Sequence, residues 1–377
     1  MLFCVRLALA ASLTLTGAAV QNPDDDSPLI RAAASGDIAT VRQLLARGDV
    51  DANITSASGA TPLFEAALYG HRNVAEILLA AGARANAADG AGSTPLLAAS
   101  QGGHTDVVQA LLDGGAEIDL ADKQGVTPLM IAAGANRTEI VRLLLDRGAD
   151  VNARTKEGSN ALMAAAFGGQ ADVVQTLLTR HADFTARDQR ARTVLMAAAL
   201  GGSAAVVSAL LSTGAELEAV DAEGDTALAY SIAYGFLDVG ALLLNAGAIK
   251  GRDEFLVAAA RQGRIPLVRV LLARGIDVNT KVDHDTTAIA EAAAHGEIDM
   301  VEFLLSVGAN ANVKDVDGET PLMAAAAFGD LRTVEAIIRS GADREAVDIH
   351  GRTAWNHAVR NGHAEIAKLL EGTSVHE

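Results

Sequence analysis

The chain has 377 residues, half of them apolar and only 3% aromatic, and its formal net charge is −17. So few rings among so many apolar residues favour closely packed small helices over a core built around large aromatic side chains. Because an acidic surface repels phosphate backbones, the charge also argues against a nucleic acid as the partner.

Residues 1–19 have the pattern of an export signal. One charged residue, Arg6, precedes the apolar run LALAASLTLTGAAV, which is shorter than the roughly 20 residues that span a bilayer. The small residues Gly17 and Ala19 predict cleavage after Ala19, and an uncleaved N-terminal anchor is the alternative. Cleavage would remove Cys4, the only cysteine, so the mature chain would have no thiol and no disulfide.

A repeat array is predicted over residues 27–372, between a short acidic lead, 20–26, and a C-terminal tail, 373–377. A fixed period of 20 to 50 residues indicates stacked repeats and argues against several globular domains. The step is 28 residues from Thr226 to its next equivalent, Glu254, because the connector near 245–255 lacks the usual turn segment. The other equivalent positions lie 33 residues apart within two series, Thr61, Thr94, Thr127, Asn160, Thr193 and Thr226, and then Thr287, Thr320 and Thr353.

Each repeat predicts two helices joined by a tight turn. In residues 125–153, Thr127 and Pro128 suit the start of a short first helix. Asn136, where other repeats have glycine, suits a left-handed turn. A second helix with a wide apolar face follows and ends at Gly148. No repeat can bury its apolar face alone, so stability is expected to come from the stacking of neighbours.

The pattern resembles ankyrin repeats. The segments GATPLFEAALYGHRNVAEILLAAGARANA and GETPLMAAAAFGDLRTVEAIIRSGADREA match that family almost position for position, and about eleven units cover residues 27–372. The resemblance implies an all-α repeat solenoid whose helix-turn-helix units are joined by β-hairpin-like loops. It also implies a non-enzymatic protein that binds another protein through hairpin tips and the concave face of its first helices.

In this family the exposed residues of the first helix lie just before the turn between the two helices. Four of the chain's few aromatic residues fall there, and exposed rings are typical interface anchors. The alternative is that each ring folds over its own repeat and packs against the neighbouring first helix. Carried over by position, the predicted partner-binding residues are Leu68, Tyr69, Gln101, Phe167, Leu200, Tyr234, Arg261, Gln262, His295 and Phe328.

No phosphate-binding loop, nucleophile elbow or helical zinc motif occurs, so no catalytic, cofactor-binding or metal-binding residue is predicted. His71, His104 and His363 share one repeat position, which is structural in the family. Aspartates that recur at another position are interpreted as turn formers, with a calcium site between turns as the alternative. They are Asp89, Asp122, Asp188, Asp221, Asp315 and Asp348.

Methionine recurs where the family usually has histidine, at Met130, Met163, Met196 and Met323. Because Phe64, Leu97 and Val257 occupy the same position in other repeats, apolar packing is the favoured interpretation. The alternative is oxidant protection or metal handling by the thioethers. Met130, Met163 and Met196 lie one repeat apart, roughly 10 Å, so they cannot share one metal ion. Oxidant protection would require exposed sulfur atoms.

We therefore expect an exported bacterial protein that is a monomeric, non-enzymatic scaffold or inhibitor. It would bind another protein, need no cofactor and have no membrane contact after signal cleavage. The export signal and the cysteine-free mature chain favour the periplasm. An extracellular location is the alternative, and there the protein would be a secreted effector that binds host proteins.

Overall fold

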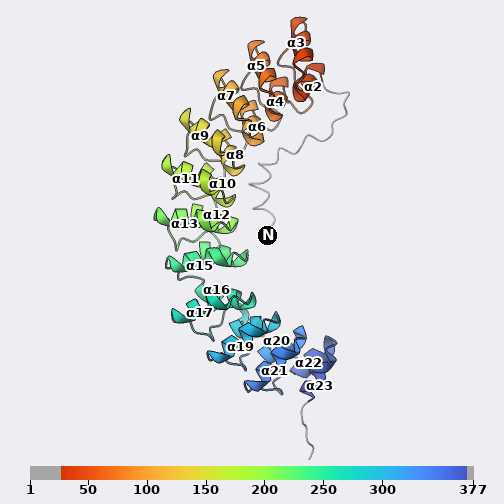
Figure 1. Ribbon diagram of the computed structural model, residues 1–377, viewed down its shortest axis with the longest axis vertical. Coiled ribbons are helices and arrows are strands. Elements are labelled where there is room, and N and C mark those ends of the chain that lie inside the picture. The colour runs from red at the N-terminus through yellow and green to blue at the C-terminus, as the bar shows by residue number, and fades with distance from the viewer. Residues whose placement is uncertain (1–26, 372–377) are drawn as a thin grey trace, which may run out of the picture. The chain divides into compact units, whose positions relative to one another are not determined.

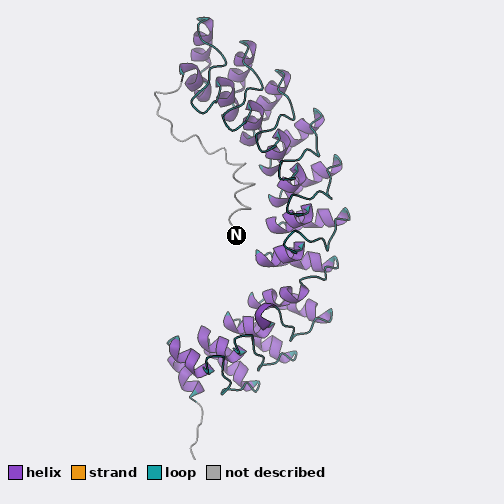
Figure 2. Cartoon of the chain, turned by 180° about the vertical axis from the view of Figure 1, so that it is seen from behind, coloured by secondary structure: helices purple, strands orange, loops and turns teal. Residues whose placement is uncertain are grey.

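The computed structural model describes residues 27–371, which contain 22 α-helices, one short 3-10 helix and no strand (Figure 1, Figure 2). The expected all-α repeat architecture is therefore confirmed. The predicted signal peptide, acidic lead and C-terminal tail lie outside the described residues. Across residues 27–371, no helix combines the length and the apolar character that crossing a membrane requires.

The chain divides into two compact units, with the boundary between Ala227 and Leu228. In unit 1 the first helices form one row and the second helices form another (Figure 1). The first helices are α2 (Pro28–Ser35), α4 (Pro62–Leu68), α6 (Pro95–Gly102), α8 (Pro128–Gly134), α10 (Ala161–Phe167) and α12 (Val194–Gly201). The second helices are α3 (Ile38–Ala46), α5 (Arg72–Ala80), α7 (Thr105–Asp113), α9 (Thr138–Asp146), α11 (Ala171–Thr179) and α13 (Ala204–Ser212).

Unit 2 has the same alternation of first and second helices. Its first helices are α14 (Ala227–Ala233), α16 (Arg252–Arg261), α18 (Ala288–Ala294), α20 (Pro321–Phe328) and α22 (Ala354–Arg360). Its second helices are α15 (Leu237–Asn245), α17 (Ile265–Ala273), α19 (Ile298–Ser306), α21 (Leu331–Arg339) and α23 (Ala364–Leu370). The 3-10 helix η1 (Asp283–Asp285) forms the loop before α18.

The threonine-proline block starts the first helices as predicted. Thr61 Oγ1 accepts the backbone N–H of Phe64 at 3.1 Å, and Pro62 takes the first helical position, where no N–H is needed. Asn160 makes the same cap through its side-chain oxygen, which accepts the N–H of Met163 at 2.9 Å. Its substitution for threonine therefore preserves the helix start. The other threonine caps are Thr94, Thr127, Thr193 and Thr320.

Small residues on the first helices and large ones on the second form the core. Alanine has no side chain beyond Cβ, so first helices of neighbouring repeats can approach closely. One fully buried alanine recurs at the same position in most repeats: Ala66, Ala99, Ala132, Ala165, Ala198, Ala259, Ala292, Ala325 and Ala358. The equivalent buried residues of the second helices are Leu78, Leu111, Leu144, Leu177, Leu210, Leu243, Leu271, Leu304, Ile337 and Leu370.

The recurring aspartates shape the hairpin tips between repeats. Asp89 Oδ1 accepts the backbone N–H groups of Ala91 and Ser93, both at 2.8 Å. The turn-former interpretation is therefore confirmed. The same pair of bonds, to residues two and four positions further on, is made by Asp122, Asp188, Asp221, Asp315 and Asp348.

Polar side chains also join successive repeats. Asn53 accepts the backbone N–H of Arg84 at 2.7 Å and donates to the carbonyl of Gly82 at 3.1 Å, both in the next repeat. The tips themselves are linked through backbone, as where Lys156 N–H donates to the Gln124 carbonyl at 2.9 Å. These bonds fix the register of each repeat against its neighbour. The asparagine bridge recurs at Asn152, Asn279 and Asn312.

The irregular repeat packs around one aromatic ring. Phe255, in α16, replaces the usual proline and is fully buried. Gly240 of α15 lies against it, because a Cβ atom at Gly240 would overlap the Phe255 ring. Gly251 precedes α16 with a φ of 86°, a left-handed conformation that suits glycine. The short connector thus depends on a glycine that admits the ring and on another that turns the chain.

We expect Gly240→Ala to lower the free energy of unfolding by about 1–3 kcal/mol, the usual range for overpacking a core. Alanine elsewhere in a helix would normally raise it. Phe255→Leu in the same chain should recover part of the loss, since leucine leaves room for the added methyl group. Urea unfolding followed by circular dichroism measures both effects. A single variant as stable as the parent would show that Gly240 is not needed to admit the ring.

Asp348 gives a pH-dependent prediction. Burial opposes its charge, yet hydrogen bonds from the Arg352 backbone and guanidinium, the His350 backbone and the His357 ring lower the pKa of Asp348 far below its usual value. Because the pKa is lower in the folded than in the unfolded chain, the ionised carboxylate stabilises the fold. This stabilisation is complete above the unfolded pKa of about 3.9 and is lost as the pH falls below that value. Asp348→Asn should therefore lower the melting temperature at pH 7.

The difference in melting temperature between Asp348→Asn and the parent should become smaller as the pH falls from about 4 toward 2. Asp317→Asn, on the exposed tip of the preceding repeat, is the matched control and should leave the melting temperature nearly unchanged. Thermal melts at pH 7, 4 and 3 provide the comparison. An equal gap at pH 7 and pH 3 would contradict the stabilising role of the Asp348 charge.

Candidate partner-binding face

The predicted partner-binding residues lie in the last turn of the first helices or directly after it. Tyr69 is the C-cap of α4, for example, and Phe328 is the last residue of α20. Each repeat contributes the two residues before its left-handed turn, such as that at Gly70 or Gly329. We call these paired residues the end positions. The surface that they form in each unit is the candidate interaction face.

In unit 1 the end positions differ widely in exposure. Tyr69 is 52% exposed, and its ring centroid lies 6.5 Å from that of His71. Leu68 is half-buried against the cluster of Ala60, Phe64 and Ala98. Gln101 and Phe167 are also half-buried. Tyr69 is thus the most exposed ring that unit 1 offers at these positions.

Leu200 corrects the sequence prediction, because it is only 7% exposed. It occupies the same repeat position as Leu68, whose side chain packs inward. Its side chain therefore packs inward and belongs to the core. It cannot serve as an exposed contact on the face.

In unit 2, Arg261, Gln262, His295 and Phe328 are exposed. Tyr234 is half-buried, and its ring stacks on Phe236 with 6.4 Å between centroids and 10° between planes. Unit 2 therefore presents charged, polar and aromatic side chains at its end positions.

Phe328 combines the two interpretations made from the sequence. One side of its ring covers Gly296 of the preceding repeat, where an added Cβ atom would meet the ring. The side chain is nevertheless among the exposed large apolar groups, at 51%. Packing against the neighbouring repeat therefore holds the ring in place and leaves the rest of it accessible.

The three repeated histidines secure the carbonyl ends of the first helices. His71 Nε2 donates to the carbonyl of Ala34 at 3.0 Å, and His104 Nε2 to that of Leu68 at 3.1 Å. His363 makes the same bond to Ala327, which confirms their structural interpretation. Arg137 replaces the ring at its position and donates to Gln101. These bonds satisfy carbonyls that helix ends otherwise leave unpaired.

One group of residues in the described range has the spacing of metal ligands, Glu319, Asp348 and His357. His357 Nε2 lies 3.1 Å from Asp348 Oδ2 and 4.0 Å from Glu319 Oε1. Asp348 Oδ2 also accepts Arg352 Nε at 2.7 Å, so an ion would have to compete with a guanidinium. The arrangement favours a structural role. Sequence reasoning singled out Asp348 alone, as one of the recurring aspartates, because Glu319 and His357 share no repeat position with it.

The methionine position is a packing position. Because oxidant protection required exposed sulfur atoms, burial removes the basis of that alternative. Met196 Sδ accepts the backbone N–H of Thr193 at 3.3 Å, which reinforces the cap of α12. Only 1–4% of each residue is exposed at Met130, Met163, Met196 and Met323.

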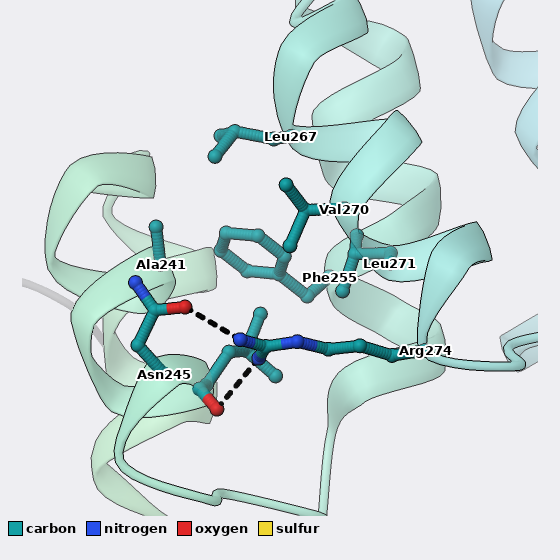
Figure 3. Close-up of a pocket in the computed structure, with 8 residues that line it drawn as sticks. Ala241, Asn245, Phe255, Leu267, Val270, Leu271 and Arg274 are labelled. Carbon is teal, nitrogen blue, oxygen red and sulfur yellow. Dashed lines mark hydrogen bonds between the residues drawn. The ribbon is translucent and has the colours of Figure 1, made fainter.

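A small cavity lies beside the irregular repeat (Figure 3), with a volume of about 70 Å³. Leu267 and Val270 line one wall, and the buried Phe255 forms part of its floor. Arg274 borders it and donates to the Leu244 carbonyl at 2.8 Å and to Asn245 Oδ1 at 2.7 Å. Ligand pockets usually measure about 300–1,000 Å³, so this cavity is too small for a cofactor.

Comparisons with known proteins agree with this architecture. A family model of ankyrin repeats matches residues 3–89, 82–155, 161–254, 248–315 and 290–376. The crystal structure of the human ASB11 ankyrin repeat domain matches with a TM-score of 0.55 and 29% identity, over 59% of this chain and 99% of that chain. The comparison with curated proteins gives no match.

The matched repeats are interaction modules and are typically non-enzymatic, which indicates a protein-protein interaction scaffold. With both helices of each repeat, their turns and their tips in place, the chain belongs to the ankyrin-repeat family.

Proposed function

We propose that this protein is a non-enzymatic scaffold or inhibitor that holds another protein on the interaction face of its first helices. The observation that carries the proposal is the exposure of Tyr69 and Phe328, which occupy equivalent positions in different repeats. Large rings that remain half-exposed at helix ends supply contact area at low conformational cost, as interface anchors do.

The surroundings of the two rings support this role. Phe328 rests on Gly296, and the helix end beside Tyr69 is secured by the bond from His104 to the Leu68 carbonyl. Groups that are already held in place lose less freedom when a partner binds. The hairpin tips carry charges of both signs, such as Lys156 and Glu157, and such charges mainly set specificity and association rate.

We further propose that the mature protein acts outside the cytoplasm, in the periplasm. The support is the sequence pattern of residues 1–19, a charged start, an apolar run and small residues before Ala19. Action beyond the cell, on proteins of a host, is the second location that the same signal allows.

The full chain, produced with a C-terminal tag in a bacterial host, should appear in the periplasmic fraction without residues 1–19. Intact-mass measurement after fractionation tests this. Ala19→Lys, which places a large charged residue at the cleavage position, should keep the full mass. Parent protein of full mass in the cytoplasm would refute export, and parent protein of full mass in the membrane fraction would indicate the uncleaved anchor.

Replacing Tyr69 and Phe328 by alanine should reduce capture of the native partner while the melting temperature stays close to that of the parent. Loss of one anchor ring typically costs about 1–2 kcal/mol of binding free energy, which raises the dissociation constant roughly five- to thirtyfold. Cross-linking and affinity capture from the source cells identify the partner, and calorimetry with the purified pair gives the constants.

Val307→Ala is the matched control, since Val307 is 42% exposed at the end of a second helix and away from the end positions. It should leave capture unchanged. Partners retained by the double variant at parental strength would refute the proposed role of the face.

A further inference from the structure

Three consecutive repeats of unit 2 meet at one turn of the interaction face. Arg261 Nε donates to His295 Nε2 at 3.1 Å, from the repeat before. The Phe328 ring covers Gly296 from the repeat after. His295 and Gly296 are adjacent in the chain, so the guanidinium and the ring lie on either side of the same turn. We call Arg261, His295 and Phe328 the Arg-His-Phe strip.

The histidine of the strip holds the arginine in position. Its Nδ1 donates to the backbone carbonyl of Glu291 at 3.0 Å, which leaves Nε2 free of a proton and able to accept from Arg261. The guanidinium is therefore directed through its Nε edge. The side chain is 59% exposed. Its outer edge, by which we mean the two terminal nitrogens, can pair with a carboxylate through two parallel hydrogen bonds.

Two carboxylates lie beside the strip. Glu291 Oε2 lies 3.8 Å from Arg261 Nε and 3.6 Å from His295 Nδ1, on the inner side of the pair. The Glu297 carboxylate lies over Gly263. Neither forms a bidentate pair with the guanidinium. Asp238, a further acid of this unit, is paired with Arg264.

The end positions as a whole lack acidic residues. The chain has 47 Asp and Glu among 377 residues, yet none stands at an end position of any repeat. Unit 2 instead places Arg261, His295 and Arg360 there. In a protein of net charge −17, the end positions themselves therefore present no carboxylate that would repel a negatively charged partner segment.

From these contacts we propose that unit 2 binds an acidic, apolar segment of its protein partner. A carboxylate of Asp or Glu pairs with the outer edge of Arg261, and a neighbouring aliphatic side chain packs on the exposed side of Phe328. Because both groups lie beside one turn, the two partner residues are one or two positions apart in sequence. This inference rests on the proposed function and specifies the chemistry that the face recognises.

Fluorescein-labelled twelve-residue peptides test the inference by fluorescence anisotropy with the full chain. One peptide alternates Glu and Leu, one alternates Lys and Leu, and one alternates Glu and Ser. The Glu-Leu peptide should bind at least tenfold more tightly than either of the others. Its affinity should fall as salt is raised from 50 to 500 mM, because exposed ion pairs are screened.

Variants of the full chain then assign the contacts. Arg261→Gln and Phe328→Ala should each weaken binding of the Glu-Leu peptide about tenfold, which corresponds to about 1.4 kcal/mol. Arg261→Lys should be intermediate, since it keeps the charge and loses the planar fork. Arg339→Gln removes the same charge from the far end of a second helix and should bind like the parent.

His295 is a positioning residue, because it holds the Arg261 guanidinium. Its variants distinguish the effect of this hydrogen bond from the effect of side-chain size. His295→Gln retains an acceptor for Arg261 Nε and should keep most of the affinity. His295→Ala removes the acceptor and should weaken the Glu-Leu peptide as Arg261→Gln does. Equal loss in both variants would overturn the positioning role.

The inference is overturned if the parent binds none of the peptides, if the Lys-Leu peptide binds as tightly as the Glu-Leu peptide, or if Arg261→Gln matches the parent. Such results leave the proposed function standing if capture of the native partner still depends on Tyr69 and Phe328. The opposite outcome is selective binding of the Glu-Leu peptide together with capture of the native partner that does not depend on Tyr69 and Phe328. It would refute the proposed function and keep the Arg-His-Phe strip as a site for acidic segments.

Discussion

Close approach of neighbouring first helices stabilises each stack of repeats and limits the size of the residues between them. It requires a residue no larger than alanine or serine at the buried position represented by Ala66 and Ala99, and those residues are fully buried. A single repeat has nothing against which to bury this surface, so the free energy that stabilises its fold comes from packing against its neighbours. With the spacing of the helices set in this way, the end positions of successive repeats come into register within each unit and form its face.

Polar groups complete what alanine packing begins. The aspartates close each tip, the asparagines bridge to the next repeat, and the histidines cover carbonyls at the helix ends. Each such bond contributes only about 0.5–1.5 kcal/mol net, but an unmade one in a partly buried place costs more. Their main effect is to allow one register only. At four helix ends a histidine or arginine side chain also covers a carbonyl beside the face.

Much of this was predictable from sequence, and the failures have physical causes. The period of 33 residues, most of the threonine caps and the aspartate turns depend on local rules and appeared as expected, whereas the Thr287 side chain makes no cap. Leu200 was predicted to be exposed because the prediction used repeat position alone. Its apolar side chain packs inward, whereas the polar side chain of Gln101 at the same position is only half-buried. Position in a pattern predicts backbone well and side-chain direction less well.

Contacts between repeats were the least visible in the sequence. The match of Gly240 to Phe255, or the bond from Arg261 to His295, joins residues 15 and 34 positions apart and leaves no periodic trace. Both contacts occur where the sequence departs from the repeat pattern. The Gly240–Phe255 contact lies at the short connector, and the Arg261–His295 bond joins the end positions of two successive repeats. Such departures distinguish this array from one of identical repeats, and only the three-dimensional structure shows the contacts that they make.

The 33-residue period itself has a consequence for how such a face can evolve. Residues one period apart occupy equivalent backbone environments, with the same cap, the same buried alanine and the same tip. Duplication or loss of one period in the gene would therefore rejoin matching ends and lengthen or shorten the face by one pair of end positions. The framework would persist through the exchange, and only the order of side chains presented to a partner would change.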